Sequence, residues 1–130
     1  MNSNSRSILA IVVAGLWINA SEFLRNEVLV KSYWVEHYRS LGLTFPSTPQ
    51  NGLVWVLWGF LFALAIYATS RRFTLVQTAL LNWFTGFVLM WVVTWNLAVL
   101  PVGILIYAIP LSLLEAFVAA YLCTKIAPAR

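Results

Sequence analysis

The sequence predicts an all-α integral membrane protein, a four-transmembrane-helix bundle with a short interfacial helix between the first two spans. Of the 130 residues, 62% are hydrophobic and 9% are charged, whereas a soluble domain is roughly 45–50% apolar and about 25% charged. Four apolar segments each approach the roughly 20 residues that a helix needs to cross a bilayer. This composition excludes a water-soluble domain, a disordered chain and a nucleic-acid-binding module, and the length fits a single membrane domain over residues 1–130.

The first segment has two interpretations. Its uninterrupted apolar stretch, residues 8–18, covers only about 16 Å at 1.5 Å per residue. It fits a signal peptide that follows Arg6 and is cleaved near Ala20. It also fits a helix over about residues 7–30 that resumes its apolar character at Val28 and carries polar residues inside the membrane. We favour the span, because the longer helix reaches the required length.

The segment over about residues 31–45 predicts a short helix at the outer membrane surface. Tyr33, Trp34 and Tyr38 are the residue types that collect at the level of the lipid headgroups. Gly42 and Pro46 then break the helix and turn the chain toward the second span.

The remaining spans are more regular. We expect them over about residues 52–70, 73–95 and 99–123. The pair Arg71-Arg72 separates the second from the third. Pro101 lies near the entry of the fourth span and Pro110 lies inside it, where we expect it to bend the helix.

The basic residues predict the orientation. With four spans, both termini lie on one side, which carries only basic residues: Arg6, Arg71, Arg72, Lys125 and Arg130. The opposite side carries two basic and two acidic residues: Lys31, Arg39, Glu27 and Glu36. The positive-inside rule therefore places both termini in the cytoplasm. We expect a multi-pass protein of a plasma membrane, the bacterial inner membrane.

Two carboxylates lie inside predicted spans, Glu22 in the first and Glu115 in the fourth. Arg25 is the single candidate base at that depth. Helical side chains lean toward the N-terminus of their own helix, so these three groups converge from spans that run in opposite directions. Two acids and one base leave the group one positive charge short, and we predict that Glu115 carries a proton at neutral pH.

Helical spacing assigns further polar residues to shared faces. We expect the polar faces of spans one, three and four to point inward, with span two, which has no polar stripe, supporting them from outside. The predicted ligand- or proton-binding site consists of Glu22, Arg25, Asn82, Ser112 and Glu115. The secondary candidates are Asn19, Asn26, Thr85, Tyr107 and His37.

Each of these residues also has a structural interpretation. Buried amides, hydroxyls and ion pairs hold transmembrane helices together. Tyr107 fits a packing aromatic, and His37 fits a solvated histidine at the membrane surface. The sequence contains no nucleophile motif, phosphate-binding loop or metal-ligand spacing, and with one cysteine it excludes an internal disulfide. We expect no metal and no cofactor.

The four-span plan with a carboxylate in the first span, Glu22, resembles that of the small multidrug resistance transporters. In that family a Glu of the first span is essential, so the resemblance implies that Glu22 is an essential residue. It covers architecture and this one residue, because residues 20–25 and the longer outer loop depart from the family pattern.

These observations leave three functions open. The leading one is binding or transport of a small solute, a lipid or a proton at the Glu/Arg/Asn cluster. The second is a structural or assembly subunit of a larger membrane complex. The third, an enzyme acting on a lipid-like substrate, would need polar residues open to the outer face and an essential His37. We expect membrane lipids as partners, with a homo-oligomer or a larger membrane complex as further candidates, and no nucleic acid.

Overall fold

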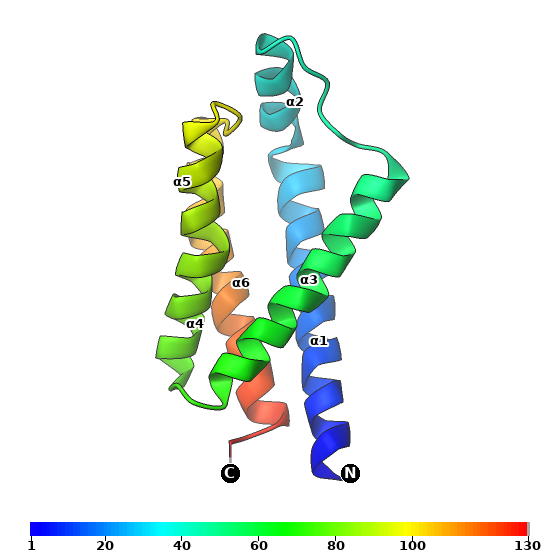
Figure 1. Ribbon diagram of the computed structural model, residues 1–130, viewed down its shortest axis with the longest axis vertical. Helices are drawn as coiled ribbons and strands as arrows, with labels where there is room; N and C mark the ends of the chain where they lie inside the picture. Colours follow the sequence, from blue (N-terminus) through cyan, green and yellow to red (C-terminus); the bar gives the residue numbers. More distant parts are fainter. Residues whose placement is uncertain (130) are drawn as a thin grey trace.

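The computed structural model describes residues 1–129. It shows long helical segments packed along one axis, with both termini at the same end (Figure 1). The elements in chain order are α1 (Ser3–Phe23), the π-helical segment η1 (Leu24–Leu29), α2 (Lys31–Ser40), α3 (Pro49–Ser70), α4 (Leu75–Trp83), the π-helical segment η2 (Phe84–Val88), α5 (Leu89–Asn96), the 3-10 turn η3 (Val102–Ile104) and α6 (Leu105–Ile126).

The four predicted spans are confirmed as helices of sufficient length and apolar character to cross a membrane. They cover Ser3–Leu29, Pro49–Ser70, Leu75–Asn96 and Val102–Ile126. The first runs without a break through Ala20, so the polar residues that follow lie on one continuous helical segment. This is therefore a four-span helical membrane protein with a short helix, α2, between spans one and two.

The helices start where side chains can satisfy the free backbone N–H groups of the first turn. The Asn2 side chain accepts a hydrogen bond from the N–H of Ser5 at 2.8 Å. Before α4, Thr74 and Gln77 form a reciprocal capping box. Thr48 and Asn51 form the same motif before α3, with a proline at the first helical position. These local signals fix the N-terminal ends of α1, α3 and α4 independently of tertiary packing.

Small residues let the helices approach closely. The main core contains Ala14, Ile18, Phe62, Ala63, Ile66, Ala79, Phe87, Ala119, Ala120 and Cys123. Many other large apolar side chains point outward; Ile106, for example, is 76% exposed. Alanine-rich helix contacts, with many large apolar side chains on the outer surface, suit a bundle surrounded by lipid.

The predicted peripheral position of span two is wrong. Phe62, Ala63 and Ile66 of α3 are buried in the main core, and α3 packs extensively against α1. The absence of a polar stripe did not indicate an outer position, because apolar side chains fill the bundle around the polar cluster.

The outer end of the bundle is organised around α2. Figure 1 shows α2 above η1, roughly continuing the direction of the first span. A second small core of Val30, Leu100, Ile104 and Ala108 joins this end to the turn between spans three and four. The loop after α2 folds back, because the Phe45 ring packs on Trp34 and on Tyr38, with ring centroids 5.9 Å and 5.3 Å apart.

Candidate functional site

The two charged residues of the first span form a local pair. Arg25 Nη2 donates to Glu22 Oε1. The other carboxylate oxygen of Glu22 accepts a hydrogen bond from Asn26 Nδ2 at 2.8 Å. Spacings of three and four residues place these side chains on one helix face, as the sequence predicted. Both oxygens of Glu22 are therefore satisfied within its own helical segment.

Arg25 also faces the fourth span. Its guanidinium carbon lies 5.3 Å from the centroid of the Phe87 ring. Its second terminal nitrogen, Nη1, lies 3.7 Å from Glu115 Oε1. The side chain is only 5% exposed. A buried arginine in this position is shared by two carboxylates from two different helices, and an aromatic face covers it.

Glu115 differs from Glu22 in its surroundings. It is 0% exposed, and neither carboxylate oxygen accepts a hydrogen bond from residues 1–129. Arg25 Nη1 likewise has no hydrogen-bond acceptor in this part of the chain. The 3.7 Å separation exceeds the usual 2.7–3.2 Å range of an N–H···O hydrogen bond. Glu115 is thus a buried carboxyl group that accepts no hydrogen bond from the described residues and whose charged neighbour is Arg25 at 3.7 Å.

Two π-helical segments frame the cluster. Arg25 lies in η1, where the N–H of Val30 bonds to the Arg25 carbonyl five residues earlier, at 2.9 Å. Phe87 lies in η2. π-helical insertions are rare and occur frequently at functional sites. The two wide turns meet where Arg25 contacts the Phe87 ring.

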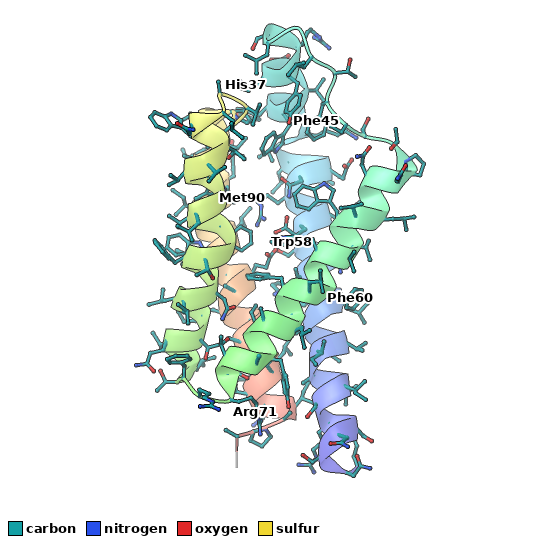
Figure 2. All side chains as sticks on the ribbon, in the orientation of Figure 1. His37, Phe45, Trp58, Phe60, Arg71 and Met90 are labelled. Atoms are coloured by element: carbon teal, nitrogen blue, oxygen red, sulfur yellow. The ribbon has the colours of Figure 1, made fainter. Side chains whose placement is uncertain are left out.

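Aromatic side chains form one wall beside Arg25. Trp58 extends from α3 toward the third span (Figure 2). Its ring lies 5.8 Å from that of Phe87 and stacks on Phe62 at 5.0 Å. Phe87 in turn lies 6.1 Å from Trp91. The polar group therefore borders an aromatic layer contributed by spans two and three.

Two tryptophans that sequence reasoning did not select brace the fourth span around Glu115. Trp17 Nε1 donates to the backbone carbonyl of Glu115 at 3.0 Å. Trp83 Nε1 donates to Ser112 Oγ at 2.9 Å. A buried tryptophan N–H usually finds an acceptor. Both tryptophans lie in the middle of predicted spans, away from the membrane surfaces where tryptophan usually collects, and this position was the signal in the sequence that could have identified them.

Asn82 and Asn19 face the second span. Asn82 is buried, and its amide donates to Thr69 Oγ1 at 2.7 Å and to the Thr78 carbonyl at 2.8 Å. Asn19 donates to the Gly15 carbonyl at 2.9 Å and to the Val56 carbonyl at 3.4 Å. The structure therefore brings Glu22, Arg25, Asn26 and Glu115 together, and it directs Asn82 and Asn19 toward α3.

Thr85 is exposed on the outside of the bundle, contrary to the inward face predicted for it. Its hydroxyl donates to the Leu81 carbonyl of its own helix at 2.9 Å. The physical reason is η2. The wider π turn that starts at Phe84 changes the helical register, so the inward position after Asn82 passes to Phe87.

Tyr107 and His37 lie apart from the cluster. Tyr107 is 42% exposed and packs edge-on against Tyr33, with centroids 6.3 Å apart. His37 Nε2 lies 2.8 Å from the carbonyl oxygen of Ala98, a hydrogen bond that connects α2 to the turn after α5 (Figure 2). Both side chains belong to contacts at the outer end of the molecule.

The charges of the cluster do not balance when all three groups are ionised. Two carboxylates face one guanidinium, and an uncompensated charge at membrane depth is expensive. One proton or one bound cation would restore neutrality. Within residues 1–129, no three His, Cys, Asp or Glu side chains are placed to share a metal ion.

The fold and the cluster define a class: a four-span helical membrane protein with a buried Glu/Arg salt-bridge cluster. Comparison of the chain with protein-family models, with curated proteins and with solved structures finds no match.

Proposed function

We propose that this protein binds and transports a proton, or a small solute in its place, at the cluster of Glu22, Arg25 and Glu115. One observation carries the proposal. Glu115 is fully buried in the fourth span, and neither of its oxygens accepts a hydrogen bond from the described chain. A carboxyl group that costs free energy to bury and accepts no hydrogen bond is a candidate for binding a proton or a solute.

In a cluster with a purely structural role, we would expect every polar side chain to be hydrogen-bonded. Side chains that only hold helices together gain stability when every member is hydrogen-bonded, and a half-satisfied network is worse than an apolar core. Glu22 meets that condition through Arg25 and Asn26. Glu115 does not. A proton on Glu115 would remove the excess negative charge.

The position of Arg25 between two acids suggests how proton binding and movement are coupled. With the proton on Glu115, Arg25 pairs with Glu22, which is the arrangement in the structure. With the proton on Glu22, electrostatic attraction moves the guanidinium toward Glu115. The proton therefore selects between two pairings across spans one and four, and π-helical η1 is the segment that must adjust.

The surroundings of the cluster also suit a cationic solute. Trp58 and Phe87 present aromatic faces beside the cluster. Such faces attract cations and stack on flat groups. A cationic solute would compete with Arg25 for the carboxylates, and would be exchanged for the proton.

The direct test is infrared difference spectroscopy of the purified protein across a pH titration. We expect the C=O stretch of a protonated carboxylic acid, and we expect Glu115→Gln to remove it. Glu27→Gln is the matched control, because Glu27 pairs with Lys31 in an exposed contact of 2.7 Å. A band that survives Glu115→Gln, or no band at any pH, would contradict the assignment.

Transport is tested separately in proteoliposomes that contain a pH-sensitive dye. Under an imposed membrane potential, the wild type and Glu27→Gln should both move protons, and Glu115→Gln should not. Native mass spectrometry of the same three proteins would detect a retained solute that the Glu115 variant loses. Equal flux in all three proteins would exclude a role for the cluster in transport.

A structural role in a larger membrane complex is the second candidate. The observation in its favour is the set of hydrogen bonds between spans, from Asn82 to Thr69 and from Trp83 to Ser112. Under this alternative, the wild type would move no protons, and Glu115→Gln would change stability or co-purification with another protein.

A further inference from the structure

A basic pocket lies at the end of the bundle where the two termini meet, far from the Glu/Arg cluster. It has a volume of about 230 Å³. Arg6 and Ser7 of α1 line one side, and Arg71 after α3 lines another. Residues 127–129, which follow α6, complete the wall. Three of the four spans therefore contribute to one concave site.

Arg71 is held in place by several contacts. Its Nη1 donates to the Ala127 carbonyl at 2.7 Å. Its guanidinium lies over the Tyr67 ring, 5.6 Å from the centroid. The Tyr67 hydroxyl is 2.6 Å from Ser7 Oγ. This series of contacts joins α1, α3 and the segment after α6, so the guanidinium is positioned before any ligand arrives. Figure 2 shows Arg71 at this end of the molecule.

Among the residues that the structure describes, the side chains lining the pocket are basic or uncharged and none is acidic. Among residues 1–129, no carboxylate lies within ion-pair distance of Arg6 or Arg71. The sequence contains no acidic residue before Glu22 and none after Glu115. A fixed arginine and a second arginine across the pocket are the groups that recognise a phosphate. The Ser7 hydroxyl is occupied by the Ser3 carbonyl at 3.0 Å, and Ser3 supplies the second hydroxyl of the lining.

We infer that this pocket binds a phosphate group, supplied by the headgroup of an anionic phospholipid. Its place at one end of the spans is the depth of the headgroups, with lipid-facing helices beside it. Basic pockets between transmembrane helices on the cytoplasmic side bind anionic headgroups. The same chemistry fits a free phosphate ion, so the experiment compares both sources.

The test is native mass spectrometry of the detergent-purified protein with an added anionic phospholipid, phosphatidylglycerol, beside zwitterionic phosphatidylcholine. We expect retention of the anionic lipid, and we expect Arg6→Gln and Arg71→Gln each to weaken it roughly tenfold. Arg72→Gln is the matched control, because Arg72 adjoins Arg71, is exposed and does not line the pocket. It should leave binding unchanged.

The outcomes separate cleanly. If all three substitutions weaken lipid retention equally, the effect comes from general surface charge and the proposed site is wrong. The proposed site is also wrong if Arg6→Gln and Arg71→Gln leave lipid retention unchanged. Competition by inorganic phosphate at the same two arginines would keep the phosphate site and reassign its source. Arg6→Gln is decisive if Arg71→Gln unfolds, because no hydrogen bond within residues 1–129 uses the Arg6 side chain.

Discussion

Arg25 contacts both acids of the cluster, and each contact differs in kind. Its pair with Glu22 is a direct hydrogen bond within one helical segment, whereas its approach to Glu115 crosses to another span at 3.7 Å. Removal of one partner from a buried ion pair leaves an uncompensated charge, which is the most costly change in such a network.

We therefore predict that Arg25→Gln destabilises the protein by roughly 3–5 kcal/mol. Addition of Glu22→Gln to this variant should recover part of the loss, because it removes the carboxylate left without its counter-ion. Reversible unfolding in mixed detergent micelles measures both variants and their coupling. Wild-type stability in Arg25→Gln would show that Glu22 does not depend on this pair.

Glu115→Gln should behave differently. Glutamine has nearly the shape of a protonated glutamate, so we expect a change in unfolding free energy of less than about 1 kcal/mol. Glu22→Gln should cost more, because Glu22 balances the charge of Arg25. The same unfolding assay compares the two. A larger loss for Glu115→Gln would indicate that Glu115 is ionised in the folded protein.

The contact between α1 and α3 depends on a glycine. A Cβ placed on Gly59 would lie 2.6 Å from Asn19 Nδ2, and Asn19 would lose its one hydrogen bond to α3, the bond to the Val56 carbonyl. At Gly52, in the first part of the same helix, a Cβ would meet nothing. Alanine substitutions at these two glycines therefore distinguish the effect of helix propensity from the effect of helix packing.

We predict that Gly59→Ala costs roughly 1–3 kcal/mol through overpacking. Gly52→Ala should be neutral or stabilising by up to about 1 kcal/mol, because alanine favours a helix. Unfolding of the two variants under the same conditions gives the comparison. Equal stabilities would mean that Asn19 moves aside without cost.

Helix α2 is attached to the bundle through His37 and the turn after α5. Ala98, whose carbonyl receives this contact, has a φ of 62°, which is uncommon for a residue other than glycine. The hydrogen bond therefore connects a surface helix to a conformationally restricted turn.

We expect His37→Ala to increase amide hydrogen exchange in α2 and in residues 97–100 while the core of the spans keeps its protection. Glu36→Ala provides the control, since Glu36 is an exposed neighbour in α2. Unchanged exchange in His37→Ala would show that the packing of Trp34 on the second small core and of Tyr33 on Tyr107 is sufficient to hold α2 in place.

At the level of the complete molecule, the distribution of charge predicts its orientation in the membrane. The end with both termini is basic, and the end with α2 is mixed. We expect the basic end to face the cytoplasm.

A membrane-impermeant maleimide tests this orientation in intact cells. Ser47→Cys should react, and Asn4→Cys should react only after lysis. The native Cys123 is buried, so the wild type should not react and serves as the control. The reverse pattern would place the basic end outside.

The four spans were accessible from the sequence because hydropathy and length define a span. Their ends were less accessible: the third span was predicted from about residue 73, whereas the Thr74 capping box starts α4 at Leu75. The pairing of Glu22 with Arg25 was equally local, since both residues lie one turn apart on one helix. The convergence with Glu115 followed from the direction in which helical side chains lean.

Tertiary packing determined the rest. The rotation of each helix and the two π-helical turns depend on neighbouring spans, so the exposure of Thr85 and the approach of Phe87 to Arg25 had no local signal. The core position of α3 likewise depends on apolar shape, which a search for polar faces does not detect. Neighbouring helices decide which polar atoms find hydrogen-bond partners, and so the absence of a hydrogen bond to the Glu115 carboxyl group became visible only in the assembled bundle.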